Sequence, residues 1–579
     1  MPIQNAQVAA MFDELADLLE IEGANPFRIR AYRNAAHAIG VLGENVEDMV
    51  ARGENLRAIP GIGAAIADKV IQIVTTGRLT QLEDLRARYP AGLGDMLALA
   101  SLGPKRVKAL YEGLGVSDLD ALEQAALQGK IRELPGFGER MEQNILEEVE
   151  RARTASRRVL LVEAEVLVAP IVAHLRAIEG VRRVEVAGSL RRRRETIGDV
   201  DIVVTAADDA RVTQGLAEYA EVQEVEAHGH TRASVRLRPG LEVDLRAMPE
   251  ESYGAALVYF TGSKAHNVRL RTLAVKMNYK VNEYGVYHGA RWLAGAEEED
   301  VYRALGLPWI PPELREDRGE IDAALAGTLP RLVTVEDLRG DLQAHTVASD
   351  GKATLEEMAR AAQARGYEYL AITDHSPSLR VAGGLEVERL ARQMDEIDRL
   401  NETLEGFRLL KSSEIEILPD GSLDLPDDLL ARLDVRICAI HSRLNLSREA
   451  QTERVLRAMD NPYFGILAHP TERLIGQRPP IEIDMERVLR GARERGCYVE
   501  VNAQPYRLDL DDVYCRLAKE IGVRVAISTD AHSPGELDYV RFGVDQARRG
   551  WLGPDDVLNT RSWEDLRPLL ERRELATGS

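Results

Sequence analysis

Two acidic side chains separated by one residue stand out in the first half of the sequence. Asp199 and Asp201 occur in the β-rich run GDVDIVVT, so both should point to one face of a strand. A third acid, Asp244, lies in the later run LEVDLR and would join them if the two strands are neighbours. Three converging carboxylates suit two Mg²⁺ or Mn²⁺ ions and in-line phosphoryl transfer.

Residues just before this pair are of types that bind phosphate. Gly188 and Ser189 offer a backbone amide and a hydroxyl for phosphate oxygens, and Arg192 could neutralise a leaving pyrophosphate. An Asp-x-Asp pair alone is more often part of a surface strand. Here, however, the pair follows a Gly-Ser dipeptide and Gly198, and a lone aspartate lies on a later strand. This order favours a catalytic site.

A second set of reactive side chains lies after residue 340. Five of the 11 histidines occur there, each where a predicted strand ends, and acids accompany them. The C-terminal strand ends of an α/β barrel form one face, so these residues should converge. Mixed imidazole and carboxylate ligands suit Zn²⁺, Mn²⁺ or Fe²⁺ and hydrolysis of a phosphoester, whereas a lone histidine is more often structural. The set comprises His345, His375, His441, His469 and His532, with Asp350, Asp374, Glu414 and Asp530.

Glycine-containing turns recur between the predicted helices of residues 1–155. Pro60-Gly61-Ile62-Gly63 and Gly136-Phe137-Gly138 share one pattern, and Gly103-Pro104 is a looser copy. Each turn leads into a helix whose free N–H groups form an anion site. The pattern looks like a helix-hairpin-helix element, which grips DNA phosphate without reading sequence; the alternative is simple packing of adjacent helices.

The elements that must position these residues fall into several domains. A chain of 579 residues predicts three to five domains at roughly 100–200 residues each. Residues 1–155 show helical spacing, residues 159–250 alternate short strands with helices, and residues from 340 alternate strands and helices regularly. The expected fold is therefore multidomain, α+β and α/β, with helical domains, a mixed sheet and a β/α barrel or doubly wound sheet.

Composition and charge exclude several classes of protein. Charged residues make up 29% and apolar residues 45%, with no 18-residue apolar stretch, so a membrane partner is not expected. Three cysteines without a CxxC motif exclude a disulfide scaffold, and the absence of a signal core predicts a cytoplasmic protein. The net charge of −21 argues against nucleic acid, but residues 340–579, with 32 basic and 43 acidic side chains, carry most of it. Basic clusters such as Arg191 to Arg194 are most simply solvated faces.

Residues 1 to about 318 resemble the family X DNA polymerases. The resemblance runs through both glycine hairpins, GSLRR, GDVDI, VDLR, VYFTGSKAHNVRLR and VNEYGVY. It implies that the three aspartates are Mg²⁺ ligands and that Gly188, Ser189, Arg192 and Gly198 belong to the nucleotide site. It also implies that Tyr259, Phe260 and Gly262 lie against the nucleotide sugar, that Asn267 reaches the incoming base, and that Arg271 contacts the template.

Three positions depart from the pattern of the beta-like members. Lys264 stands where these members have an acidic residue over the incoming base. Lys69 matches their Schiff-base lysine for 5′-deoxyribose phosphate, but Ala65 and Arg28 replace neighbouring lysines. The resemblance therefore leaves two interpretations of Lys69, a lyase nucleophile or a phosphate-binding lysine.

Residues 340–572 resemble the polymerase and histidinol phosphatase (PHP) family, a distorted β/α barrel with a trinuclear metal site. One position departs from the family pattern, because Gln343 stands where His-x-His would begin. An amide oxygen is a poorer ligand than imidazole for a borderline metal, so one metal position is expected to be weak or to favour Mn²⁺. The ligands implied are His345, Asp350, His375, Glu414, His441, His469, Asp530 and His532.

Both resemblances together match a bacterial-type family X polymerase with a C-terminal PHP domain. The predicted activity is gap-filling DNA synthesis from deoxynucleoside triphosphates in base excision repair, with a 3′–5′ exonuclease, and abasic-site endonuclease or 3′-phosphatase action as additions. The alternatives are a DNA-end nuclease or phosphatase with a weak polymerase site, and a DNA-binding scaffold. The expected partner is gapped or primer-template DNA, and the expected state a monomer. The expected domains are 1–85 (lyase-like), 86–155 (fingers-like), 156–250 (palm), 251–318 (thumb-like), 319–339 (linker) and 340–579 (PHP).

Overall fold

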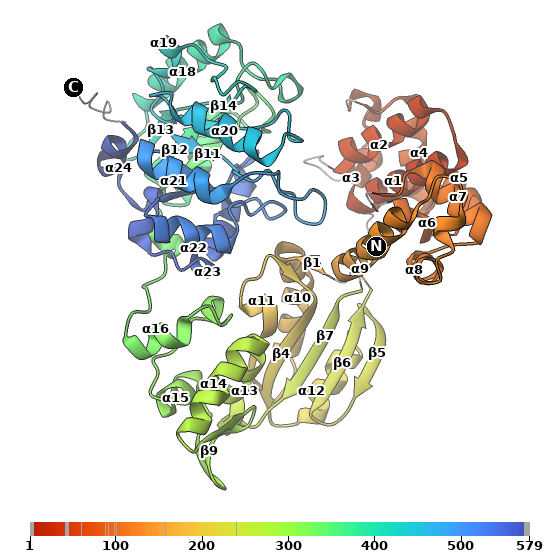
Figure 1. Cartoon of the computed structure of the whole chain (residues 1–579), viewed down its shortest axis with the longest axis vertical. Helices are drawn as coiled ribbons and strands as arrows, with labels where there is room; N and C mark the ends of the chain where they lie inside the picture. Colours follow the sequence, from red (N-terminus) through yellow and green to blue (C-terminus); the bar gives the residue numbers. More distant parts are fainter. Residues whose placement is uncertain are drawn as a thin grey trace. The chain divides into compact units, whose positions relative to one another are not determined.

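The computed structural model divides the chain into two compact units, Met1–Arg157 and Arg158–Ser579 (Figure 1). It describes residues 5–40, 46–59, 61–86, 88–90, 92–97, 99, 101–156, 158–238 and 240–571. Within these ranges no helix combines the length and the apolar character needed to cross a membrane. All three cysteines are buried, and none of them forms a disulfide.

The first unit is helical, as the spacing of its apolar residues predicts. Val8, Leu15, Leu18 and Leu19 are at most 1% exposed and lie in one core shared by the helices of this unit. Its helices are α1 (Asn5–Glu22), α2 (Pro26–Gly40), α3 (Val46–Ala51), α4 (Ala64–Thr76), α5 (Thr80–Arg86), α6 (Gly92–Leu97), α7 (Pro104–Leu114), α8 (Leu119–Leu127) and α9 (Glu139–Ser156), with short 3₁₀ turns at Leu56–Ala58 and Ile131–Glu133.

The second unit begins with the predicted mixed sheet, which we call the palm. Its strand order is β2-β4-β7-β6-β5, and β4 and β7 run parallel whereas the other neighbours are antiparallel. The strands are β2 (Val181–Val186), β4 (Asp199–Ala206), β5 (Val222–His228), β6 (Arg232–Leu237) and β7 (Glu242–Ala247), with a small pair β1 (Val159–Leu160) and β3 (Thr196–Ile197). The helices are α10 (Leu161–Arg176), α11 (Gly188–Arg191) and α12 (Asp209–Ala217).

Three helices and a small antiparallel sheet follow the palm, and we call this segment the thumb. Its elements are α13 (Tyr253–Thr261), α14 (Lys264–Lys276), β8 (Lys280–Asn282), β9 (Gly285–His288), β10 (Arg291–Ala294) and α15 (Glu298–Ala304). The expected linker 319–339 contains α16 (Glu320–Ala326), whose Ile321 and Ala324 pack into the hydrophobic cluster of the thumb. This connecting segment is therefore folded.

The remaining residues form parallel strands with helices between them, here called the PHP part. The sheets run β11-β12-β13 and β14-β15-β16-β17-β18, and bridges at His375–Glu414 and Ala344–Ala531 connect them into an irregular closed ring. This agrees with the expected distorted barrel. The strands are β11 (Gly340–Ala344), β12 (Tyr369–Ile372), β13 (Arg408–Lys411), β14 (Glu414–Glu416), β15 (Ile437–Ala439), β16 (Ile466–Leu467), β17 (Tyr498–Asn502) and β18 (Val525–Ser528). The helices are α17 (Leu355–Ala364), α18 (Val387–Asn401), α19 (Asp427–Leu430), α20 (Arg448–Met459), α21 (Met485–Arg495), α22 (Asp512–Ile521), α23 (Val540–Arg549) and α24 (Trp563–Leu570).

The PHP part shares hydrophobic cores with the palm and the thumb. Leu508 and Phe542 are fully buried in the cluster that fills the palm, and Trp551 belongs to the cluster of the thumb. The three parts of the second unit are therefore packed together and not merely connected in sequence.

Candidate functional sites

The three aspartates of the palm converge because their strands are neighbours. Asp201 pairs directly with Asp244 across the parallel strands β4 and β7, and Asp199 precedes Asp201 on the same face. Val200 and Val243, which point to the other face, are buried. Burial and the charges of Asp199 and Asp244 raise the pKa of Asp201 to about 7. Such carboxylate repulsion is relieved by divalent cations, so this donor set fits the predicted metal.

A pocket of about 380 Å³ lies beside these carboxylates. Ser189 lines it, and its buried Oγ has no hydrogen-bond partner among the residues that the structure describes. Gly188 has a φ of +63°, and a Cβ there would collide with the Asp201 carboxylate. The pocket thus unites the predicted phosphate-binding segment with the YFTGS segment. Its walls comprise Arg158, Gly188, Ser189, Arg192, Arg194, Asp199, Asp201, Phe260, Gly262, Ser263 and Lys264.

Four other predicted nucleotide or template residues lie outside these walls, namely Gly198, Tyr259, Asn267 and Arg271. Asn267 donates hydrogen bonds to the carbonyls of Tyr259 (2.7 Å) and Gly262 (3.2 Å), so its amide group holds the turn between α13 and α14. Tyr259 packs edge-on against Phe260, with 5.2 Å between the ring centroids. Arg271 is exposed, and its Nε donates to the carbonyl of Asn267. Their contacts with nucleotide or template stay predictions.

The run Arg191 to Arg194 is not a solvated face, so that prediction is wrong for this cluster. Arg191 pairs with Glu298 through two hydrogen bonds of 2.8 and 2.9 Å, and burial limits its exposure to 18%. Arg192 Nε lies 3.0 Å from Glu316 Oε1, and 12% of the Arg192 side chain is exposed. The remaining partners are Glu165 and Asp545 for Arg193, and Glu316, 3.6 Å away, for Arg194.

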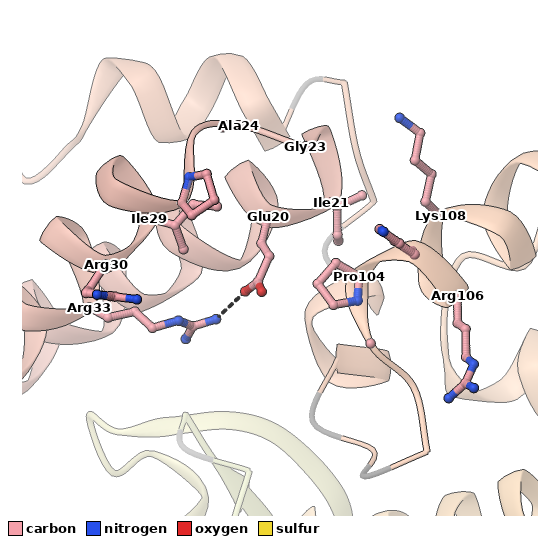
Figure 2. Close-up of a pocket in the computed structure, with 13 residues that line it drawn as sticks. Glu20, Ile21, Gly23, Ala24, Ile29, Arg30, Arg33, Pro104, Arg106 and Lys108 are labelled. Atoms are coloured by element: carbon pink, nitrogen blue, oxygen red, sulfur yellow. Dashed lines mark hydrogen bonds and ion pairs between the residues drawn. The ribbon is translucent and has the colours of Figure 1, made fainter.

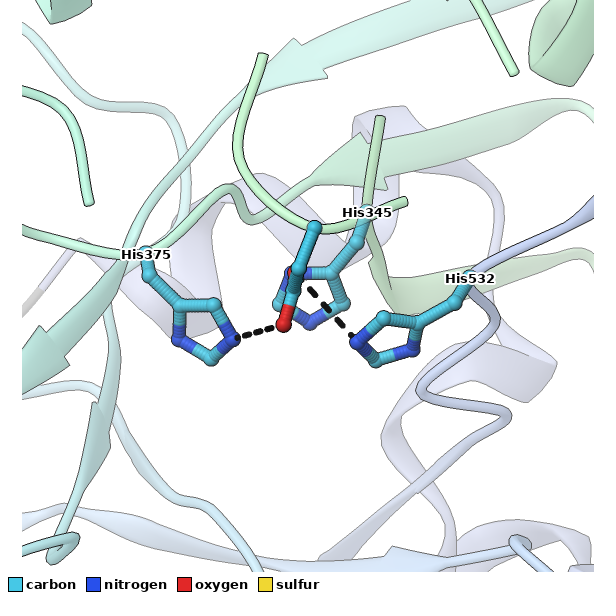
Figure 3. Close-up of side chains that lie close together, drawn as sticks. His345, His375 and His532 are labelled. Carbon is cyan, nitrogen blue, oxygen red and sulfur yellow. Dashed lines mark ion pairs between the residues drawn. The ribbon is translucent and has the colours of Figure 1, made fainter. Parts of the chain in front are cut away.

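The predicted PHP ligands gather around Glu414. Its carboxylate lies 2.7 Å from His469 Nε2, 3.0 Å from His441 Nε2 and 3.3 Å from His345 Nε2. Asp350 lies 3.3 Å from His375 and 3.4 Å from His532, and Asp530 lies 3.0 Å from His345. Figure 3 shows the imidazoles of His345, His375 and His532 close together. Three overlapping groups have metal-ligand spacing: His345, Asp350, His375 and His532; His375, Glu414 and His441; and His345, Glu414 and Asp530. His469 joins them through Glu414.

Charge and unpaired atoms show that this cluster fits divalent metals. Both ring nitrogens of His345 and Nδ1 of His375 are buried without a hydrogen bond to any described residue. Although burial opposes it, the carboxylates of Asp530 and Glu414 hold the pKa of His345 well above its ordinary value. Likewise, Glu414 and Glu416 raise the pKa of His441 to about 9 against the effect of burial. The carboxylates therefore stabilise positive charge in the cluster. Bound metal ions can supply this charge in place of protons on the imidazoles.

Sequence reasoning missed residues that orient the ligands. Glu416 lies 2.9 Å from His441 Nδ1, and Glu472 contacts His469 Nδ1. Such contacts set which ring nitrogen faces the metal. Glu416 could have been found, because it is two residues after Glu414 on one strand and shares its face. Glu472 follows β16 in a loop, where no periodic pattern marks it.

Asp374 and Gln343 lie beside the cluster of predicted ligands, and their contacts differ from those of the ligands. Asp374, an acid that accompanies the predicted histidines, accepts hydrogen bonds from Thr346 and Gln393 and so stabilises a loop beside the cluster. Gln343 is fully buried, its Oε1 has no partner among the described residues, and its Nε2 lies 3.5 Å from Asp530 Oδ1. Gln343 therefore sits at the cluster, as the missing imidazole would.

The hairpin glycines of the first unit are exposed beside buried apolar residues. Ile62, Leu102 and Phe137 are at most 8% exposed and anchor the three turns. Gly61 and Gly136 have positive φ, whereas Gly63 and Gly103 are N-caps with extended backbone. A Cβ on Gly63, Gly103 or Gly138 would meet no described atom within 4 Å. Pro60 lies outside the described residues.

A basic cavity of about 940 Å³ adjoins one of these hairpins (Figure 2). It lies between α1, α2 and the start of α7, and Arg30, Lys105, Arg106 and Lys108 contribute positive charge. Arg33 at its edge is neutralised by Glu20, 2.9 Å away, and by Asp17. Lys69 lies elsewhere, half-buried on α4.

Comparison with known proteins identifies the family. The DNA polymerase/3'-5' exonuclease PolX of Bacillus subtilis is 37% identical over 571 residues, covering 98% of this chain and 99% of its own. The chain belongs to the bacterial family X DNA polymerases with a C-terminal PHP domain. Models of the DNA polymerase beta thumb, a helix-hairpin-helix domain and a SAM-like helix-hairpin-helix tandem match residues 256–316, 3–79 and 93–151.

Two further relatives each match only a part of this family X polymerase. DNA polymerase lambda of Arabidopsis thaliana is 26% identical over 352 residues, 54% of this chain and 62% of its own. A probable phosphatase of Thermoanaerobacter sp. is 30% identical over 231 residues, 38% of this chain and 89% of its own. The likeness of one chain to both kinds of protein agrees with its two acid-rich centres.

Proposed function

We propose that the protein fills short gaps in DNA by template-directed synthesis and degrades 3′ ends with a metal-dependent 3′–5′ exonuclease. The observation that carries this proposal is that one chain holds two centres of different ligand chemistry. The palm presents carboxylates beside a pocket of about 380 Å³ lined by arginines, and the PHP part presents imidazoles with carboxylates. The similarity to the polymerase/exonuclease of Bacillus subtilis along nearly the whole chain supports the pairing.

In the proposed polymerase site, Asp199, Asp201 and Asp244 would hold two Mg²⁺ or Mn²⁺ ions. When bound, such ions activate the primer 3′-hydroxyl and neutralise the triphosphate. The 3′-hydroxyl loses its proton to solvent water and its oxygen attacks the α-phosphorus, the bond to the bridging oxygen breaks, and pyrophosphate leaves. Ser189 Oγ donates to a phosphate oxygen, and Arg192 balances the charge of the leaving group.

The neighbouring residues of the pocket would select the substrate. We place Phe260 and Gly262 against the deoxyribose, with Tyr259 supporting them. Gly188 and Gly198 give the triphosphate close access to backbone. Asn267 would offer its amide to the incoming base and Arg271 its guanidinium to the template strand, while Lys264 adds positive charge to the pocket wall.

In the proposed exonuclease site, up to three Zn²⁺, Mn²⁺ or Fe²⁺ ions would be held by the eight predicted ligands. When bound, they supply the Lewis acidity that activates water toward a terminal phosphodiester. Glu416 and Glu472 keep His441 and His469 oriented. Gln343 offers an amide oxygen, which favours Mn²⁺ at that position.

Both activities would act on gapped or primer-template DNA held by the hairpin glycines Gly61, Gly63, Gly103, Gly136 and Gly138. Backbone N–H groups at helix starts bind phosphate irrespective of sequence. We propose a monomer, because a single chain supplies every residue of both sites.

The test is a 5′-labelled primer in a one-nucleotide gap with Mn²⁺, with and without deoxynucleotides. Asp201→Ala should abolish lengthening and keep shortening, and His375→Ala should do the reverse. Asp395→Ala and His288→Ala, which remove exposed side chains of the same types, are the matched controls. Shortening alone in the wild type would favour a nuclease, and DNA binding without either change would favour a scaffold.

A further inference from the structure

The predicted triphosphate-binding arginine is already held by a carboxylate. Arg192 Nε lies 3.0 Å from Glu316 Oε1, and its Nη1 donates to the carbonyl of Thr261 at 2.8 Å. Both charged side chains are largely buried, with 12% and 9% exposed. Glu316 therefore competes with a triphosphate for the Nε side of the Arg192 guanidinium.

Glu316 has a second partner, which comes from the PHP part. Arg549, the last residue of α23, places Nη1 3.1 Å from Glu316 Oε1 and 2.8 Å from the carbonyl of Arg192. Its Nη2 donates to Asp512 at 2.5 Å, and only 3% of its side chain is exposed. Arg549 thus touches both the partner of Arg192 and the backbone of Arg192 itself.

The charges of this cluster are arranged for an exchange of partners. Burial raises the pKa of Glu316, but the neighbouring Arg192 and Arg549 outweigh it and hold that pKa below its ordinary value. A buried carboxylate that loses its only cation is strongly destabilised. With Arg549 in place, Glu316 remains paired when Arg192 turns toward phosphate.

We propose that Arg549 is a positioning residue of the polymerase site: it keeps Glu316 neutralised so that Arg192 is free to bind the triphosphate. The PHP part thereby contributes to nucleotide binding by the palm. The proposal rests on the role proposed above for Arg192. Without Arg549, Glu316 would depend on Arg192 and on the more distant Arg194 and would compete with the nucleotide.

Single-turnover gap filling tests this, because it yields the apparent nucleotide Kd and the maximal rate separately. Arg549→Met should raise the Kd roughly tenfold, the value of one charge-assisted hydrogen bond, with little change in maximal rate. Exonuclease activity without nucleotide should stay at the wild-type level. Arg541→Met is the matched control, since Arg541 lies on the same helix and contacts the palm at Glu165, away from Glu316.

A second substitution separates positioning from simple damage. The double variant Arg549→Met/Glu316→Gln should restore the wild-type Kd, because no carboxylate then competes for Arg192. A Kd unchanged in Arg549→Met, or a double variant as weak as Arg549→Met, would overturn the proposal. If Arg549→Met does not fold, Glu316→Gln alone should leave the Kd at the wild-type level, because Arg549 already neutralises Glu316, and a tenfold higher Kd overturns the proposal. Arg192→Met tests the proposed function by itself: a wild-type Kd there refutes the nucleotide site, whatever Arg549 does.

Discussion

The fold leaves room for a larger side chain at two of the hairpin glycines. Gly63 and Gly103 have φ values of −81° and −92°, which any residue adopts, and open space surrounds their missing Cβ atoms among the described residues. Neither backbone strain nor internal packing therefore requires glycine at these two positions. Close approach of a phosphate to the helix N–H groups does provide a reason.

Replacing both residues by alanine should accordingly separate DNA binding from stability. We expect Gly63→Ala/Gly103→Ala to weaken binding of gapped DNA about tenfold, by obstructing charge-assisted hydrogen bonds to phosphate. Folding should lose about 1 kcal/mol per site at most, because alanine is a poorer N-cap than glycine. Fluorescence anisotropy and thermal unfolding measure the two quantities.

The matched control is Gly94→Ala, which adds the same methyl group in α6, where nothing described lies within 4 Å. It should leave DNA affinity unchanged. Wild-type affinity in the hairpin variant would show that these turns only pack helices.

Lys69 offers a second test at the scale of single residues. Lys69 is half-buried on α4, and a lysine amine can form a Schiff base with a sugar aldehyde. If it is the lyase residue, borohydride should trap a covalent adduct with 5′-deoxyribose phosphate DNA, and Lys69→Ala should abolish trapping. Lys108→Ala, in the hairpin helix α7, should trap normally. An undiminished adduct in Lys69→Ala would leave Lys69 as a phosphate-binding residue.

Among the elements, α14 and α16 are joined by a fully buried polar contact. His266 Nδ1 lies 2.6 Å from Glu320 Oε1, and His266 Nε2 lies 3.2 Å from the hydroxyl of Tyr302. Burial lowers the pKa of His266 below its ordinary 6.5, although Glu320 opposes the shift. The imidazole is therefore kept neutral at a pH where the same group in an unfolded chain takes up a proton.

This contact should make the thumb sensitive to acid. Below pH 6.5 the unfolded segment binds a proton that the folded one refuses, so stability falls with pH until the lower folded pKa is reached. The loss is at most about 1.4 kcal/mol for each pH unit. Hydrogen exchange of α14 and α16 at pH 7.5 and 5.5 measures it. In His266→Gln this pH dependence should shrink, and an equal dependence in both proteins would contradict the assignment.

Patterns along strands made much of both centres predictable. Asp199 and Asp201 follow the two-residue period of β4, and the parallel register of β4 and β7 then brings Asp244 opposite Asp201. Each of the five histidines follows a parallel strand, so the ring of strands collects them at one end. Local periodicity and strand direction are sufficient for such sites.

Contacts between segments far apart in the sequence could not be predicted from local patterns. Glu316 and Arg549 are 233 residues apart, and no period or turn signal relates them. The run Arg191 to Arg194 looks solvent-exposed in sequence, because its carboxylate partners lie on α10, α15 and α23 and in the segment after α15. Such pairings depend on how whole parts pack.

At the scale of the whole molecule, we expect the palm, thumb and PHP part of the second unit to unfold together. Phe542 is fully buried in the palm core although it belongs to α23 of the PHP part. Phe542→Ala removes an aromatic ring from that core, a change that costs about 3–5 kcal/mol. We expect heat to inactivate the polymerase and the exonuclease together, at a temperature below that of the wild type.

Val513→Ala provides the comparison, since Val513 lies on the neighbouring α22 with 52% of its surface exposed. It should leave both inactivation temperatures within error of the wild type. Loss of polymerase activity alone in Phe542→Ala would mean that the parts unfold separately.

The shared cores also bear on how such a gene can be divided. A stop codon after residue 339 would release a palm without Leu508 and Phe542 and a thumb without Trp551. The apolar surfaces left open would favour aggregation or proteolysis of the fragment. Recombination that exchanged the hydrolytic module would have to carry matching residues for those cavities. Dividing the gene between the two parts should therefore impair both of its products.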